Sequence, residues 1–96
     1  MQTSKYIDLR GLLSYQILHE IGRKPRFGDE LANIIGNRKG SKLTPGTIYP
    51  ALKRLRENKL IIATKIGRRV VYKLTAKGKK EYKTARKYVR ILLKSF

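Results

Sequence analysis

The chain has 96 residues, of which 41% are hydrophobic, a composition that supports one small folded domain rather than a disordered basic tail. It has no cysteine, one histidine and six scattered carboxylates, which excludes disulfides and thiolate metal sites and argues against a catalytic site, a metal or a cofactor. Twenty-four Lys and Arg residues give a formal charge of +18, and this excess indicates a polyanionic partner.

Nucleic acid is the favoured partner because its phosphates release condensed counterions when basic side chains bind. An anionic membrane surface is the rival, but it requires a basic amphipathic helix that is free to lie flat. A basic surface that is merely solvated is the third reading, and self-repulsion of this size argues against it. The sequence has no apolar run long enough to span a bilayer and no signal-peptide pattern at its start. We therefore expect a cytoplasmic protein, in contact with the nucleoid or in the cytoplasm of a host cell.

Two helices are predicted in the first part of the chain. Asp8 caps "LRGLLSYQILHEI", and Gly22 is expected to close this helix in a left-handed conformation. Its apolar stripe consists of Leu9, Leu13, Ile17 and Ile21. "RKPR" is predicted as a turn or a short extended piece, and "FGDELANII" as a second helix that ends at Gly36.

A third helix is predicted from Thr44, which is a candidate N-cap, with Pro45 at the first helical position. Pro50 lies one turn further on and deletes an amide near the helix start, so we expect a slight bend rather than a break. The buried face is predicted to hold Ile48, Ala51, Leu52 and Leu55.

A β-hairpin and a last helix complete the pattern. "LIIATKI" and "VVYKLT" flank "GRR" as two strand-like runs, with Gly67 at the turn. Alternation in the second run directs Val70, Tyr72 and Leu74 inward. Thr75 then caps a helix that continues to the end of the sequence. The apolar seam of this helix comprises Tyr82, Ala85, Val89, Leu92 and Phe96.

This order of elements predicts a mainly α protein with a small β-hairpin (α+β), arranged as a winged helix-turn-helix with a C-terminal dimerisation helix. Residues 1–75 would form the DNA-binding part and residues 76–96 the dimerisation helix, within a single structural domain. In such a fold the second helix of the pair enters the major groove, and the hairpin tip contacts the backbone or the minor groove beside it.

Three motifs carry a family resemblance. "LTPGTIYPALKRLRENKLI" closely resembles the recognition-helix signature of the PadR family of transcriptional regulators, while "FGDEL" and "GRRVVYKLTAKGKK" are similar to its second helix and its wing. The resemblance covers about residues 9–82. It implies a homodimeric winged-helix DNA binder whose C-terminal helix makes the dimer and whose Thr47–Tyr49 region touches DNA, and members usually repress transcription. The chain departs from the family pattern at Asp29, where an aromatic residue is usual, and at Asn58–Lys59, where an acidic residue precedes glycine.

Candidate DNA contacts lie on three segments. Thr47 and Tyr49 are favoured as phosphate contacts because the buried face already belongs to their neighbours, whereas a cap alone would explain Thr44 and solvation would explain Arg54. The full set is Arg38, Lys39 and Lys42 before the helix, Thr44, Gly46, Thr47, Tyr49, Pro50, Lys53 and Arg54 in it, and Lys65, Arg68 and Arg69 in the hairpin.

The last helix leaves two questions open. Its seam is predicted as a homodimer interface, although it could also pack on the first helix of the same chain. Its many lysines and arginines either form the solvent-exposed face of this helix or extend the surface that contacts DNA. His19 is predicted to be an ordinary, partly exposed residue.

The sequence therefore predicts a DNA-binding regulator that recognises a specific double-stranded sequence. It would bind a pseudo-palindromic site as a homodimer and repress transcription there. Two alternatives are a non-sequence-specific architectural protein that coats DNA and a protein-interaction module built on the same fold. No feature of the sequence supports a small-molecule effector.

Overall fold

The computed structural model describes residues 9–37 and 40–95. Four predictions fall outside the described residues: the helix cap at Asp8, the DNA contacts at Arg38 and Lys39, and the seam position at Phe96. The order of elements is α1 (Leu9–Arg23), β1 (Arg26–Phe27), α2 (Gly28–Asn37), α3 (Pro45–Glu57), β2 (Ile61–Ile66), β3 (Arg69–Leu74) and α4 (Ala76–Lys94). The prediction of three helices, a hairpin and a fourth helix is confirmed.

The three-stranded sheet is antiparallel, with the strand order β1-β3-β2. β2 and β3 form the predicted hairpin in a register that pairs Ile61 with Leu74 and Ile66 with Arg69. Gly67 adopts φ +62° in the turn, as a tight hairpin requires. β1 is a two-residue strand that pairs with the outer edge of β3. The segment "RKPR", predicted as a turn or a short extended piece, therefore leads into an edge strand.

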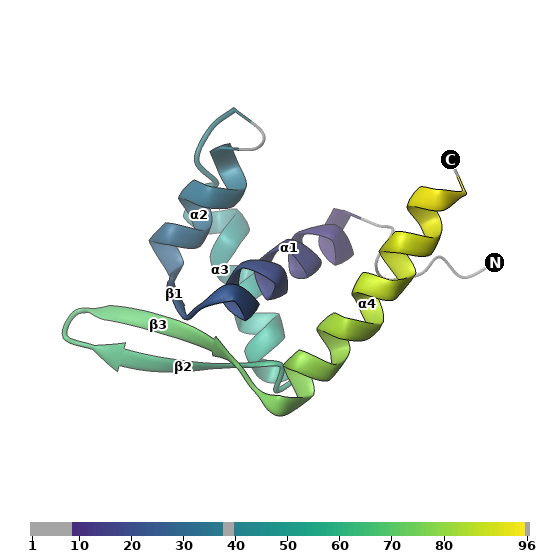
Figure 1. Ribbon diagram of the computed structural model, residues 1–96. Coiled ribbons are helices and arrows are strands. Elements are labelled where there is room, and N and C mark those ends of the chain that lie inside the picture. The colour runs from purple at the N-terminus through teal and green to yellow at the C-terminus, as the bar shows by residue number, and fades with distance from the viewer. Residues whose placement is uncertain (1–8, 38–39, 96) are drawn as a thin grey trace.

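The hydrophobic core lies where α1, α2, α3 and the base of the hairpin meet. Its least exposed members come from every one of these elements: Ile17, Leu31, Ile35, Ile48, Ala51, Leu52 and Ile61. Figure 1 shows α1 in the middle of the molecule with α3 behind it, the hairpin projecting to one side and α4 standing on the other side. None of the described helices combines the length and the apolar character that crossing a bilayer requires.

Helix termini confirm some of the sequence predictions and correct others. The Thr75 hydroxyl accepts a hydrogen bond from the Gly78 amide at 2.9 Å, so this predicted cap is confirmed. Thr44 is the N-cap of α3 by position, but its side chain makes no cap hydrogen bond. Gly22 does not close α1 in a left-handed conformation, because the helix continues to Arg23. α2 likewise runs one residue past Gly36.

A buried ion pair joins α1 to β1. Glu20 is fully buried, and its Oε1 lies 3.3 Å from Nη2 of Arg26, which is only 9% exposed. The Arg26 Nε also donates to the Glu20 backbone oxygen at 3.3 Å. This pair fixes the start of the edge strand, and with it the beginning of α2, against the end of α1.

Candidate nucleic-acid interface

α3 has a covered side and an open side. Its apolar residues pack against α1 and α2, where Ile48 and Leu52 are each 1% exposed. The helix is continuous from Pro45 to Glu57, so Pro50 does not break it, as the sequence predicted. Six of the seven predicted contact residues of this segment lie on the open side, whereas Arg54 is partly buried; the six exposed residues are Thr44, Gly46, Thr47, Tyr49, Pro50 and Lys53.

The turn between α2 and α3 is tight. Ser41 donates its amide to the Gly36 carbonyl at 3.0 Å, and Leu43 donates to the Ala32 carbonyl at 3.1 Å. A Cβ atom on Gly36 would lie 2.2 Å from the Ser41 carbonyl oxygen, so only glycine allows the two segments to approach this closely. The turn thereby fixes α3 against α2 and leaves the Lys42 side chain exposed beside the start of α3.

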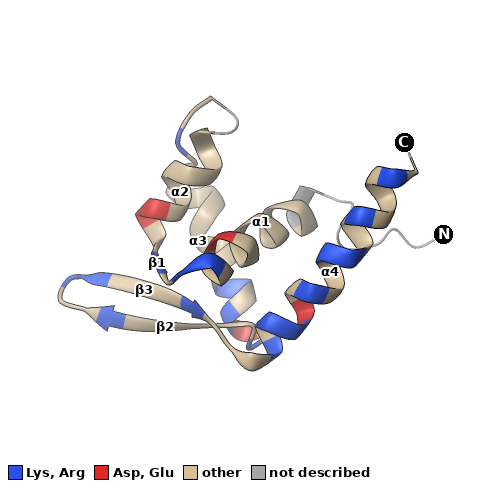
Figure 2. Cartoon of the chain, in the orientation of Figure 1, with Lys and Arg blue, Asp and Glu red and all other residues tan. Residues whose placement is uncertain are grey.

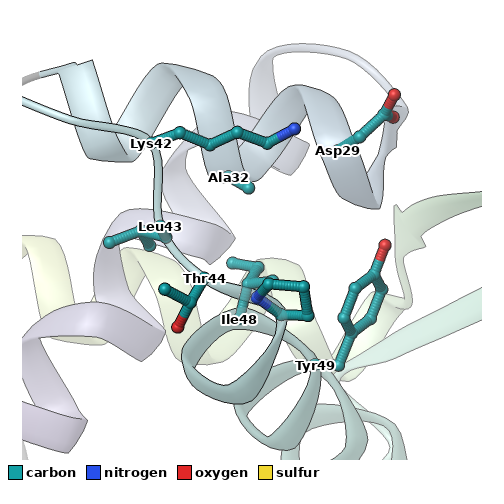
Figure 3. Close-up of a pocket in the computed structure, with 8 residues that line it drawn as sticks. Asp29, Ala32, Lys42, Leu43, Thr44, Ile48 and Tyr49 are labelled. Carbon is teal, nitrogen blue, oxygen red and sulfur yellow. The ribbon is translucent and has the colours of Figure 1, made fainter.

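Tyr49 stands between two surface hollows. The first has a volume of about 330 Å³ and lies between α2, the turn and the start of α3 (Figure 3). The second, of about 300 Å³, lies between α2, α3 and the hairpin. The Tyr49 ring packs over Gly28, where an added Cβ would lie 3.0 Å from a ring carbon. Gly28 therefore supports one face of the ring, while 46% of the residue remains exposed.

The two arginines at the wing tip have different surroundings. Arg68 is exposed at the turn. Arg69 donates from Nη2 to Oδ1 of Asp29 at 2.8 Å, and its guanidinium carbon lies 3.6 Å from the centre of the Phe27 ring. The hydrogen bond from Arg69 lowers the pKa of the Asp29 carboxyl below its usual 3.8. The sequence treated these arginines alike, whereas in the structure Arg69 ties the wing to the start of α2.

The apolar seam of α4 is divided between the chain's own core and its surface. Ala85 is fully buried in the single chain, and the Tyr82 hydroxyl lies 2.6 Å from Nδ1 of His19 on α1. Burial raises the pKa of the Tyr82 hydroxyl. Ala85, which the sequence predicts as part of a dimer interface, is therefore already covered by its own chain. Val89 and Leu92 are partly buried.

His19 was predicted as an ordinary, partly exposed residue. It is partly buried in an aromatic cluster with Tyr15 and Tyr82, whose ring centroids are 5.6 Å apart. Among the described residues, no group of His, Cys, Asp or Glu side chains is arranged to hold a metal ion.

A helix pair joined by a tight turn, a second helix with an open polar side and a hairpin wing beside it define a winged helix-turn-helix DNA-binding protein. The comparisons with known proteins specify the class. The sequence profile of the transcriptional regulator PadR-like family matches residues 17–84, so the chain belongs to this family of transcription regulators, which are not enzymes. A search among curated protein sequences found no significant match.

Solved structures of transcription regulators share the fold. A transcriptional regulator from Clostridium thermocellum is 26% identical, with a TM-score of 0.78 over 99% of this chain and 94% of that chain. A PadR family transcription regulator from Clostridium difficile is 28% identical, with a TM-score of 0.77 over 88% and 94% of the two chains. A structure from Thermoplasma acidophilum described as a transcriptional regulator is 33% identical, with a TM-score of 0.70 over 90% and 94%.

Proposed function

We propose that the protein recognises a specific double-stranded DNA sequence as a homodimer and represses transcription where that sequence overlaps a promoter. Each subunit would insert α3 into the major groove of one half-site, and the two half-sites of a pseudo-palindrome would lie about 10 base pairs apart. The protein would act in the cytoplasm, where the nucleoid lies.

The contrast between the two sides of α3 carries this proposal. Neighbouring positions differ sharply, because Ile48 is 1% exposed while Thr47 and Tyr49 on either side are open. An added Cβ on Gly46 would meet only the Thr44 hydroxyl, at 4.0 Å, so packing within the chain does not require glycine there. A close approach of DNA backbone to this turn explains the residue better.

The proposal divides recognition between the helix and the wing. Thr47 and Lys53 would contact base edges or nearby phosphates and so set the preferred sequence. Arg68 would contact the sugar-phosphate backbone or a narrow minor groove, together with Lys65 and Lys42. Affinity would come largely from phosphates and fall steeply with salt.

Residues 76–96 would supply the dimer interface. Ile91 and Leu93, toward the end of α4, are 63% and 69% exposed, the highest values among the large apolar side chains of the described residues. Val89, Leu92 and Leu93 fall within an arc of about 100° and form an apolar surface that a second copy of the helix can cover, and Ile91 lies about 100° further around the helix. The symmetric pairing of two α4 helices would set the distance between the two α3 helices.

An architectural role is the second candidate, favoured by the formal charge of +18 and the small size of the chain. The two functions differ in the ratio of affinities for preferred and random duplexes at physiological salt. A regulator is expected to prefer its site about a thousand-fold or more, whereas a coating protein shows almost no preference.

Selection of bound fragments from a pool of random duplexes tests the proposal. Purified protein should enrich a motif with two-fold symmetry and half-sites about one helical turn apart. Lys53→Ala should flatten the enrichment, whereas Arg68→Ala should weaken all duplexes alike and reduce the salt slope. A pool that remains random after repeated rounds with the wild-type protein would favour the architectural role.

A further inference from the structure

The basic residues of α4 form one continuous stripe. Figure 2 shows Lys and Arg recurring along the whole helix. At 3.6 residues per turn, seven of them fall within an arc of about 120°. All seven are exposed, and the basic stripe consists of Lys79, Lys80, Lys83, Arg86, Lys87, Arg90 and Lys94. It runs over about 22 Å of helix, at 1.5 Å per residue.

This stripe lies opposite the side of α4 that packs on the chain. Ala85 and Tyr82 face α1, and the centre of the stripe is about 130° around the helix from the direction midway between them. Glu81, the one acidic residue of α4, falls on the far side of the helix from the stripe. The field of the stripe is therefore positive along its whole length.

Ordinary solvation does not account for such a pattern. An exposed helix face that serves only solubility mixes charges, because Glu and Lys four residues apart stabilise a helix and like charges at that spacing destabilise it. The stripe contains four basic pairs at that spacing, for example Lys79–Lys83 and Lys83–Lys87. A helix that accepts these repulsions gains from them only when a polyanion covers the stripe.

The position of α4 separates this stripe from the α3–wing surface. α1 packs against both α3 and α4 and lies between α4 and α2 (Figure 1). The stripe faces away from α1, and the open side of α3 also faces away from the side that packs on α1. A duplex that lies along α3 and the wing would have to bend around α1 to follow the stripe as well, and DNA resists bending because it is stiff over about 150 base pairs.

We propose that the basic stripe of α4 is a second DNA-binding surface, which holds the sugar-phosphate backbone of a second duplex segment while α3 and the wing hold the first. The protein would then bridge two DNA segments. This inference rests on the proposed function for the first duplex. Recognition by the stripe would be independent of sequence, because lysines and arginines on an exposed helix face contact phosphates without reading base edges.

The test is a bridging assay with a charge-matched control. A 30-base-pair duplex of random sequence is fixed to beads, and retention of a second, fluorescent copy is measured after protein is added. Lys83→Glu with Lys87→Glu reverses the middle of the stripe, and the new carboxylates can pair with basic neighbours, which protects the helix. Lys24→Glu with Lys73→Glu makes the same change in net charge at exposed positions that belong neither to the stripe nor to the proposed contact residues of α3 and the wing.

We expect the wild-type protein and the control to retain the fluorescent duplex, and the stripe variant to lose retention to the level of beads without protein. Binding to one duplex in solution should change equally in the stripe variant and the control. Lys80→Glu with Arg90→Glu should reproduce the loss, and sedimentation should give all variants the wild-type mass. In the absence of DNA, the stripe variants should melt at a higher temperature than the control, because most of the like-charge pairs that the replaced residues make become attractive pairs.

Two results would overturn the inference. Retention by both stripe variants at the level of the control would show that the stripe does not hold DNA. The second result has two parts: the wild-type protein does not bridge two duplexes, and a stripe variant binds a single duplex more weakly than the control does. The stripe would then contact the flank of the same duplex that α3 and the wing bind. Lys53→Ala separates the two proposals, because it should weaken binding to one duplex through α3 whatever the stripe does.

Discussion

Replacing Asp29 by Asn removes the carboxylate that ties the wing to the start of α2. The Asp29 and Arg69 side chains are 55% and 50% exposed, and their nearest charged atoms are 2.8 Å apart. Double-mutant cycles on exposed ion pairs of this kind give about 0.2–1 kcal/mol. We expect the cycle formed by Asp29→Asn, Arg69→Gln and the double variant to give a coupling energy in that range in urea unfolding at pH 7.

The pH dependence of this coupling has a definite sign. Arg69 lowers the pKa of Asp29 in the folded state below 3.8, so the pair stabilises the fold fully at pH values above 3.8. The stabilisation should be lost as the pH falls through the lowered pKa, where the carboxylate becomes protonated. A coupling of zero at pH 7, or an unchanged coupling well below pH 3.8, would refute the assignment of the ion pair.

DNA binding supplies a second measurement on the same variants. Asp29 lines both hollows beside Tyr49, so its negative charge lies on the surface proposed to meet phosphates. Asp29→Asn should therefore bind a random duplex more tightly than the wild-type protein and release Arg69 for a phosphate, whereas Arg69→Gln should bind more weakly. Weaker binding by Asp29→Asn would mean that wing position matters more than local charge.

Three further predictions concern other parts of the molecule. Gly36→Ala forces a Cβ against the backbone of the turn and should lower the unfolding free energy by about 1–3 kcal/mol. Gly46→Ala has space for the Cβ, so this variant should keep the wild-type stability in urea unfolding but bind DNA more weakly. Equal stability of the two variants would contradict the tight turn. Glu20→Gln leaves the Arg26 charge buried without its carboxylate and should cost about 3–5 kcal/mol in the same assay, and a loss below about 1 kcal/mol would contradict a buried pair. Leu93→Asp should split the homodimer in sedimentation, and an unchanged mass would exclude this surface as the interface.

Periodicity predicted the parts of the fold that depend on long amphipathic segments. The buried face of α3 and the inward side of β3 could be predicted because apolar residues repeat at helical or strand spacing over several turns or pairs. The two-residue strand β1 has no period of its own, and only its pairing with Val71 and Tyr72 defines it. Gly22 was misassigned because a glycine near a helix end usually closes it, whereas here an added Cβ would meet a Leu74 methyl at 3.3 Å.

The charges that pair within the chain were harder to predict from the sequence. Glu20 lies among buried apolar residues of α1, and its charge is matched by Arg26, which folds back from the next segment. In the same way, Arg68 and Arg69 are adjacent and chemically identical, but only the second meets Asp29 across the sheet. These pairings join residues 6 and 40 positions apart in different elements, and neither helical nor strand spacing encodes them.

Protection of a thiol at position 47 tests the central claim most directly. The natural sequence has no cysteine, so Thr47→Cys and Lys24→Cys each provide a single reactive thiol at an exposed position. If the open side of α3 enters the duplex, saturating DNA should strongly slow alkylation of the Thr47→Cys variant and leave that of the Lys24→Cys variant unchanged. Equal alkylation rates of the Thr47→Cys variant with and without bound DNA would contradict the account.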